Sequence, residues 1–390
     1  MTDRINFALF KPFSHPFVKD ENSVFAVVAN TWAKNIVRLF FERHGSTLFD
    51  ASSAISTGLR NFYESDLPLS VCWDPIIGKL EKFLEEEDAY LNNYLTGILC
   101  YLSIKGFIPD WKIDLAVKGD LFFDNYSITN CSFSSLLHDS RGKCITFSND
   151  KGDFHLFYSA PKKSSNAFFV TALRANQHYP LTYAYLQDSR FDIIEKLSDF
   201  INLPKPTRNK NRVNEGLLLL KRHSPDYFNW VITMTKQVIL YSSPAANQIK
   251  SGSWFDLPGI YNFSVNHEPL LVAEMLIHES SHQYFNLLKR FGEVATSQEA
   301  IYYSPAVNKM RPLWLILLAY HAFANVLIFY RILEKQNIAG RDQVKSRILE
   351  TEPLVLCLEE HLVKSRSIEG LTPCGKALFE PLYEKLRSVK

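Results

Sequence analysis

The feature that most constrains the fold of this chain is an H-E-x-x-H motif formed by His278, Glu279 and His282 within a helix-like stretch. Pro269 suits the first turn of a helix, and Gly292 suits the left-handed residue just past its end. Because residues four apart share one face of a helix, the two imidazoles project together and can bind one metal ion. Glu279 would lie beside that ion, within reach of a bound water or substrate. The alternative is a buried helix with two ordinary histidines.

A metal held by His278 and His282 needs a third protein ligand, for which the sequence offers His321 and Glu299. His321 lies inside the apolar stretch 313–330, where coordination would satisfy a neutral imidazole facing the motif helix. The alternative for His321 is a core histidine hydrogen-bonded to a backbone carbonyl. Glu299 follows the motif closely, as the third ligand does in one layout of zinc peptidases.

Composition predicts a soluble, cytoplasmic protein. The 43 basic and 41 acidic side chains give a formal charge of +2, which creates no general attraction to nucleic acid or to a membrane surface. The six cysteines show no C-x-x-C spacing, which fits a reducing compartment, and the amino terminus lacks the pattern of a secretory signal. The stretch 313–330 is as long as a short membrane span, but a histidine near its middle favours a buried core helix.

The pattern along the chain predicts an α+β fold with two domains. Apolar residues recur at helical spacing in residues 22–43, and short aromatic and β-branched segments between residues 107 and 160 predict a small antiparallel sheet. A basic run at residues 204–212 lacks interleaved aromatic side chains, so we interpret it as a solvated linker instead of a nucleic-acid site. The predicted domains are residues 1–205, with a role in peptide or partner recognition, and residues 206–390, a mostly helical metal-binding domain.

Three segments together carry a resemblance to a known family. They are PGIYNFSVNHEPLLVAEMLIHESSHQ, YYSPAVNKMRPLWLILLAYHAFANVL and GLTPCGKAL, which fall within residues 215–378. In this order they resemble the HExxH-type peptide β-hydroxylases, which are iron- and 2-oxoglutarate-dependent enzymes that modify ribosomally made peptides. The resemblance implies an Fe(II) cofactor, 2-oxoglutarate as co-substrate and a precursor peptide as partner. It does not extend to residues 1–205.

The resemblance also implies roles for individual residues. His278, His282 and His321 would form a three-histidine face on the iron, although the common face has two histidines and one carboxylate, so that Glu279 or Glu299 could replace His321. Arg311 would bind a carboxylate of 2-oxoglutarate through its planar guanidinium. The alternative for Arg311 is a charged residue that flanks a helix.

Two other functional classes share the same motif. A zinc metallopeptidase would use Glu279 as the general base that activates a metal-bound water, and it would need neither Arg311 nor 2-oxoglutarate. A non-catalytic protein would carry a structural metal or none, and its amino-terminal region would bind a peptide or partner. The sequence does not reveal the peptide, the modified residue or the oligomeric state.

Overall fold

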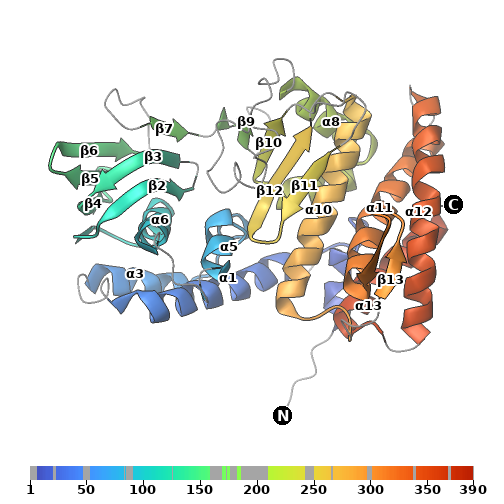
Figure 1. Ribbon diagram of the computed structural model, residues 1–390, viewed down its shortest axis with the longest axis horizontal. Coiled ribbons are helices and arrows are strands. Elements are labelled where there is room, and N and C mark those ends of the chain that lie inside the picture. The colour runs from blue at the N-terminus through green and yellow to red at the C-terminus, as the bar shows by residue number, and fades with distance from the viewer. Residues whose placement is uncertain are drawn as a thin grey trace, which may run out of the picture.

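The computed structural model describes residues 7–20, 23–46, 53–82, 84, 91–124, 126–158, 169–172, 174–175, 182–185, 210–241, 250–264, 267–296, 301–336, 340–367 and 370–389. The predicted α+β class is confirmed: helices dominate both ends of the chain, and small sheets lie between them (Figure 1). Glu299 and residues 204–209 of the predicted linker lie outside the described residues.

The amino-terminal part combines helices with the predicted antiparallel strands. Its helices are η1 (Phe7–Phe13), α1 (Val24–His44), α3 (Ser53–Glu64), α4 (Leu69–Cys72), α5 (Pro75–Lys82) and α6 (Leu91–Ile104). Its strands are β1 (Trp111–Ile113), β2 (Val117–Phe123), β3 (Tyr126–Phe133), β4 (Ser135–Asp139), β5 (Cys144–Asn149), β6 (Gly152–Phe157) and β7 (Phe169–Ala172). They pair antiparallel as two sheets, in the orders β1-β4-β5-β6 and β2-β3-β7, so the predicted antiparallel pairing is confirmed.

A mixed sheet occupies the middle of the molecule and carries the motif helix. Its strands are β8 (Arg174–Ala175), β9 (Thr182–Tyr185), β10 (Gln237–Tyr241), β11 (Ser251–Trp254) and β12 (Leu257–Ser264), in the order β11-β12-β10-β9-β8. The neighbours β9, β10 and β12 run parallel, whereas β11 pairs antiparallel with β12 at the end of the described sheet. Every side chain of β10 and β12 is buried, as expected for strands that are covered on both faces.

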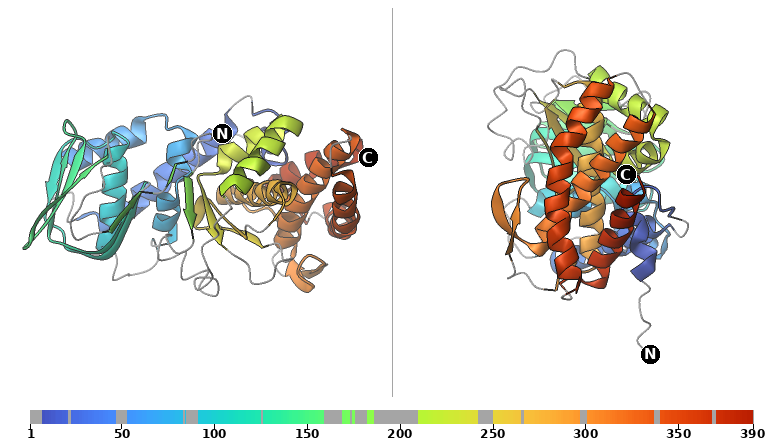
Figure 2. Two further views of the ribbon diagram at one scale, coloured as in Figure 1. Left: turned by 90° about the horizontal axis from the view of Figure 1, so that it is seen from above. Right: turned by 90° about the vertical axis from the view of Figure 1, so that its right-hand side faces the viewer.

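Helices pack around this sheet and form the carboxy-terminal end of the molecule. They are α8 (Lys210–His223), α9 (Pro225–Met234), α10 (Pro269–Phe291), α11 (Leu313–Lys335), α12 (Arg341–Ser367) and α13 (Pro373–Ser388). Helix α10 contacts β11 and β12 and also packs against α11, which in turn contacts α12 and α13 (Figures 1 and 2). A hairpin of β13 (Ile301–Ser304) and β14 (Lys309–Pro312) precedes α11 and protrudes from this end of the molecule (Figure 2).

Helix α10 begins at Pro269, as predicted, because proline needs no hydrogen-bond partner at the first helical position. The prediction for its other end is wrong in one respect. Gly292 follows the helix, but its φ of −174° and ψ of 159° are extended instead of left-handed. Its N–H still donates to the Leu288 carbonyl, which satisfies one of the carbonyls at the end of the helix.

The amino-terminal and carboxy-terminal parts of the chain pack together closely. Strand β9 pairs with β10, so residues on both sides of the predicted boundary at residue 205 share one sheet. Helix α1 contacts α10, and η1 packs against α13. The division into two domains therefore stays a prediction, and the described contacts cross it at several points.

Within the described residues, two helices are long and apolar enough to cross a membrane, judged by length and composition alone. They are α1 and α11, of which 56% and 78% respectively of the most apolar window is buried within the fold. Helix α11 covers the stretch that we interpret as a core helix, and buried core helices of soluble proteins have the same composition. The cytoplasmic location and the absence of a membrane partner stay predictions.

Candidate functional site

His278 and His282 lie one turn apart on α10, and their side chains converge. The two Nε2 atoms are 3.0 Å apart, and the rings meet edge to face with their centroids 4.6 Å apart. Burial lowers the pKa of His278 to about 4. Burial, with smaller contributions from His278 and His321, also lowers the pKa of His282 well below its ordinary value. Both imidazoles are therefore neutral near pH 7, which is the form that binds metal ions.

The residues of this pair fit two ligands of one metal ion. Nitrogen ligands lie about 2.0–2.1 Å from a zinc ion, so two of them on the same ion are roughly 3 Å apart, as the two Nε2 atoms are here. The other ring nitrogen of His282, Nδ1, is buried and has no hydrogen-bond partner within the described part of the chain. A third protein ligand is not in place: among the described residues, no group of three His, Cys, Asp or Glu side chains could hold an ion.

His321 occupies a different environment from the motif histidines. Its Nε2 lies 2.9 Å from both the Phe13 and the Ser14 carbonyl oxygens, so this nitrogen carries the proton and donates to η1 and the residue after it. The side chain is fully buried, and burial lowers its pKa to about 4 despite the backbone carbonyls, which raise it. This arrangement matches the alternative of a core histidine bonded to backbone carbonyls. A ligand role for His321 stays a prediction.

Glu279 faces strand β11. Ser251 Oγ donates to Glu279 Oε1 at 2.6 Å, and Ser253 Oγ donates to Oε2 at 2.8 Å. The Glu279 side chain is only 1% exposed. Burial raises the pKa of Glu279 to about 7, while the two serine donors oppose the rise. Each carboxylate oxygen therefore has a hydrogen-bond donor from the same strand.

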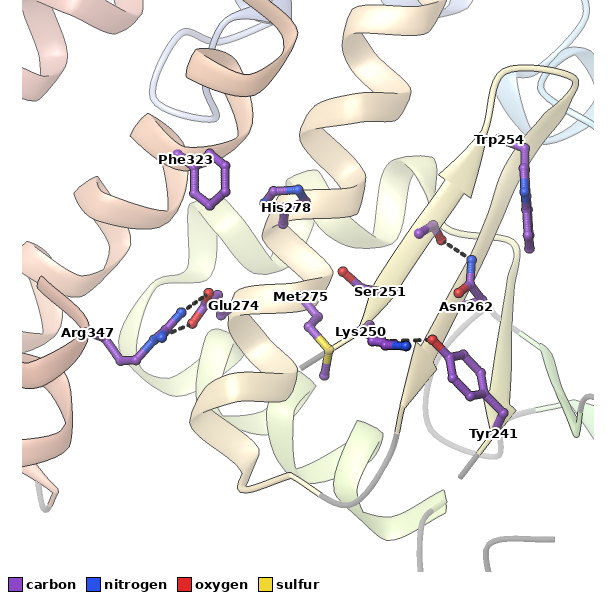
Figure 3. A pocket seen from close by; sticks show the side chains of 11 residues that line it. Tyr241, Lys250, Ser251, Trp254, Asn262, Glu274, Met275, His278, Phe323 and Arg347 are labelled. Carbon is purple, nitrogen blue, oxygen red and sulfur yellow. Dashed lines mark hydrogen bonds and ion pairs between the residues drawn. The ribbon is translucent and has the colours of Figure 1, made fainter. Parts of the chain in front are cut away.

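An open cavity of about 570 Å³ reaches His278 (Figure 3). Its wall combines residues of the mixed sheet, the residue before β11, and residues of α10, α11 and α12: Tyr241, Lys250, Ser251, Gly252, Trp254, Asn262, Glu274, Met275, His278, Phe323 and Arg347. Phe323 packs edge to face on His278 with centroids 5.0 Å apart, which restricts the orientation of that imidazole. Arg347 forms an ion pair with Glu274, with one N–O distance of 2.5 Å.

Arg311, the predicted carboxylate ligand, lies in β14 directly before α11 and opposite Tyr302. Strand β14 contacts α11, and the Arg311 side chain is partly exposed. The arginine that contributes to the cavity beside His278 is Arg347 of α12. The role of Arg311 in binding 2-oxoglutarate stays a prediction.

Sequence reasoning missed several residues of this site. Glu274 is four residues before His278, so helical spacing could have placed it on the same stripe. Ser251, Ser253 and Arg347 have no such local relation to the motif, because tertiary packing alone brings β11 and α12 to α10.

Comparisons with known proteins identify no family for this chain. No protein-family model matches the chain, and a search of curated proteins finds no match. The resemblance to HExxH-type peptide β-hydroxylases thus rests on the sequence segments that suggested it.

Proposed function

We propose that this protein is a cytoplasmic, metal-dependent enzyme that modifies a peptide side chain. In its most specific form, the proposal is an iron(II)- and 2-oxoglutarate-dependent hydroxylase that acts on the β-carbon of a residue in a ribosomally made precursor peptide. The observation that carries the metal dependence is the pair of neutral imidazoles, 3.0 Å apart, of which His278 lines an open cavity. The resemblance of residues 215–378 to the peptide β-hydroxylases supplies the reaction class.

The position of Glu279 favours this reaction over peptide hydrolysis. A zinc peptidase needs the glutamate of the motif to take a proton from a metal-bound water, which requires a carboxylate that faces the open side of the metal. Here the two oxygens of Glu279 accept hydrogen bonds from Ser251 and Ser253, and the side chain is almost fully buried. The hydroxylase chemistry places no such demand on Glu279.

Each residue of the site has a separate role in this proposal. His278 and His282 would hold the iron. Bound iron would supply the chemistry for using dioxygen as the oxidant, with two electrons from 2-oxoglutarate, which leaves as succinate and CO₂, and two from the hydroxylated C–H bond. Phe323 and Met275 form an apolar part of the cavity wall near His278, which limits the access of water to that side. His321 as third ligand and Arg311 as carboxylate ligand complete the proposal on the strength of the resemblance.

An anaerobic titration of the purified protein with iron(II) and 2-oxoglutarate tests this proposal. We expect a weak visible charge-transfer band from the chelate, and we expect His278→Ala to abolish it. His155→Ala removes an exposed imidazole on β6 and serves as the matched control that keeps the band. The absence of a band together with tightly held zinc would contradict the proposal and favour the peptidase.

A further inference from the structure

The hydrogen bonds of Glu279 connect two walls of the site. Glu279 belongs to α10, whereas Ser251 and Ser253 belong to β11, and each serine hydroxyl donates to a different carboxylate oxygen. Residues two apart on a strand point to the same face, so the two serines form a pair of donors that matches the two oxygens of one carboxylate. The glutamate thus joins the helix that carries His278 to the strand that lines the cavity.

Strand β11 is held by backbone pairing with β12 and by side-chain contacts with α10. It is the end strand of its sheet, where it pairs with β12, and a register shift between Ser253 and Trp254 interrupts that pairing. On its sheet side, Asn262 Nδ2 donates to the Gly252 carbonyl at 2.7 Å. Side chains of two α10 residues bond to the strand: Glu279 accepts from Ser251 and Ser253 at 2.6 and 2.8 Å, and Gln283 Nε2 donates to the Trp254 carbonyl at 3.5 Å. The two hydrogen bonds of Glu279 are the shorter ones.

The location of β11 gives this attachment a consequence for the site. Ser251, Gly252 and Trp254 form part of the cavity wall on the sheet side, and His278 forms part of the wall on the helix side. Glu279 directly follows His278, so any movement of β11 relative to α10 would act on the backbone next to the first motif histidine.

We propose that Glu279 is a positioning residue, clamped by Ser251 and Ser253, that fixes β11 against α10 and thereby sets the orientation of His278 and His282. In this role its carboxylate contacts neither the metal nor a metal-bound water. The effect on metal binding rests on the proposed function, because it requires that the two histidines hold an ion. The hydrogen bonds of Ser251 and Ser253 to Glu279 do not require an ion.

Two substitutions at Glu279 separate positioning from direct participation. Glutamine keeps both contacts, because its amide oxygen accepts from one serine and its NH₂ group donates to the hydroxyl oxygen of the other. Alanine removes both contacts. If Glu279 positions the site, Glu279→Gln should behave as the wild type and Glu279→Ala should not.

The experiment is a titration of the full-length protein with cobalt(II), whose visible absorption reports the number and geometry of its ligands. We expect Glu279→Gln to keep the wild-type spectrum and affinity. We expect Glu279→Ala and Ser251→Ala/Ser253→Ala to bind cobalt(II) about 10-fold or more weakly, the usual cost of losing a residue that orients ligands. A spectrum that changes in Glu279→Gln as much as in Glu279→Ala would overturn the proposal, as would a double serine variant with wild-type binding and spectrum.

Hydrogen exchange separates failure of the clamp from failure of the metal site. Loss of the clamp should increase amide exchange in residues 251–254 in Glu279→Ala and leave it unchanged in Glu279→Gln, with no metal present. A wild-type protein that binds no cobalt(II) but shows this exchange pattern would contradict the proposed function and retain the clamp. Unchanged exchange in Glu279→Ala would overturn the clamp whatever the metal does.

Discussion

The charge of His15 depends on its burial within the packed fold. Its Nε2 lies 3.2 Å from the Pro381 carbonyl oxygen, and its Nδ1 accepts a hydrogen bond from the Phe17 N–H. Burial is the main cause that lowers the pKa of His15 from 6.5 to about 4. The Pro381 carbonyl opposes this shift, and Lys385 and His321 contribute to it. The folded protein therefore keeps this imidazole neutral at pH values where the unfolded chain would protonate it.

This pKa shift predicts a loss of stability in mild acid. Because the folded pKa lies below the unfolded value, the unfolded chain binds the extra proton between pH 6.5 and about 4, and the free energy of unfolding falls as the pH falls through this window. The contribution of His15 amounts to about 3 kcal/mol. His15→Gln keeps an N–H donor for Pro381 and should show a shallower pH dependence in urea unfolding. Equal slopes in the two proteins would contradict this assignment.

A second prediction concerns the ion pair in the cavity wall. Arg347 binds Glu274 through two nitrogen atoms, and the two side chains are only 19% and 9% exposed. Arg347→Met leaves the Glu274 carboxylate buried without its cation, so it should lower the free energy of unfolding by about 3 kcal/mol or more. The double variant Arg347→Met/Glu274→Gln should recover most of that loss in urea unfolding. A neutral effect of Arg347→Met alone would show that the pair does not stabilise the fold.

At the scale of single residues, the sequence predicts what lies close along one helix. His278, Glu279 and His282 could be identified because their spacing determines their relative directions on any α-helix. The partners of Glu279 could not, since Ser251 and Ser253 reach it only through the packing of β11 on α10. The same holds for the carbonyls that bind His321, which come from residues more than 300 positions away along the chain.

At the scale of elements, local sequence patterns predicted where α10 and α11 begin. Pro269 marks the observed start of α10, and the continuous apolar run from Leu313 onward marks that of α11. The antiparallel strands between residues 107 and 160 follow their turn signals in the same way. The mixed sheet was harder to predict, because parallel pairing of β9 with β10 joins segments more than 50 residues apart and no local pattern specifies it.

The contact of Arg290 on α10 with Trp32 on α1 leads to a prediction about the stability of the fold. Arg290, near the end of α10, has a side chain that is 1% exposed and pairs with Glu81 at 3.0 Å. Its guanidinium also stacks on Phe255 and Trp32, at 3.9 Å and 4.5 Å from the ring centroids. Lysine has no planar group to satisfy these contacts together, so Arg290→Lys should lower the free energy of unfolding by about 2 kcal/mol.

An exposed arginine provides the matched control for that substitution. Arg38 pairs with Glu42 on the surface of α1, where the two side chains are 48% and 58% exposed. Arg38→Lys should therefore change the free energy of unfolding by less than about 0.5 kcal/mol. Equal effects of the two substitutions in urea unfolding would contradict the buried role of Arg290.

At the scale of the whole molecule, the amino-terminal part completes the fold around the motif helix. The Phe13 and Ser14 carbonyls bind His321 on α11, and Asn325 Nδ2 also donates to Ser14. We therefore expect a fragment of residues 206–390 to lack cooperative unfolding and dispersed amide resonances, whereas the full chain shows both. A fragment that folds cooperatively would establish the predicted boundary at residue 205 as a real domain boundary.

The proposed function requires that His278 and His282 hold one metal ion. The most direct measurement is the iron(II) content of the anaerobically loaded protein after removal of free metal, compared among the wild type, His278→Ala, His282→Ala and His155→Ala. We expect one ion per chain in the wild type and in His155→Ala. We expect both motif variants to lose the ion while their circular dichroism stays that of a folded chain. Full iron content in a folded His282→Ala variant would contradict it.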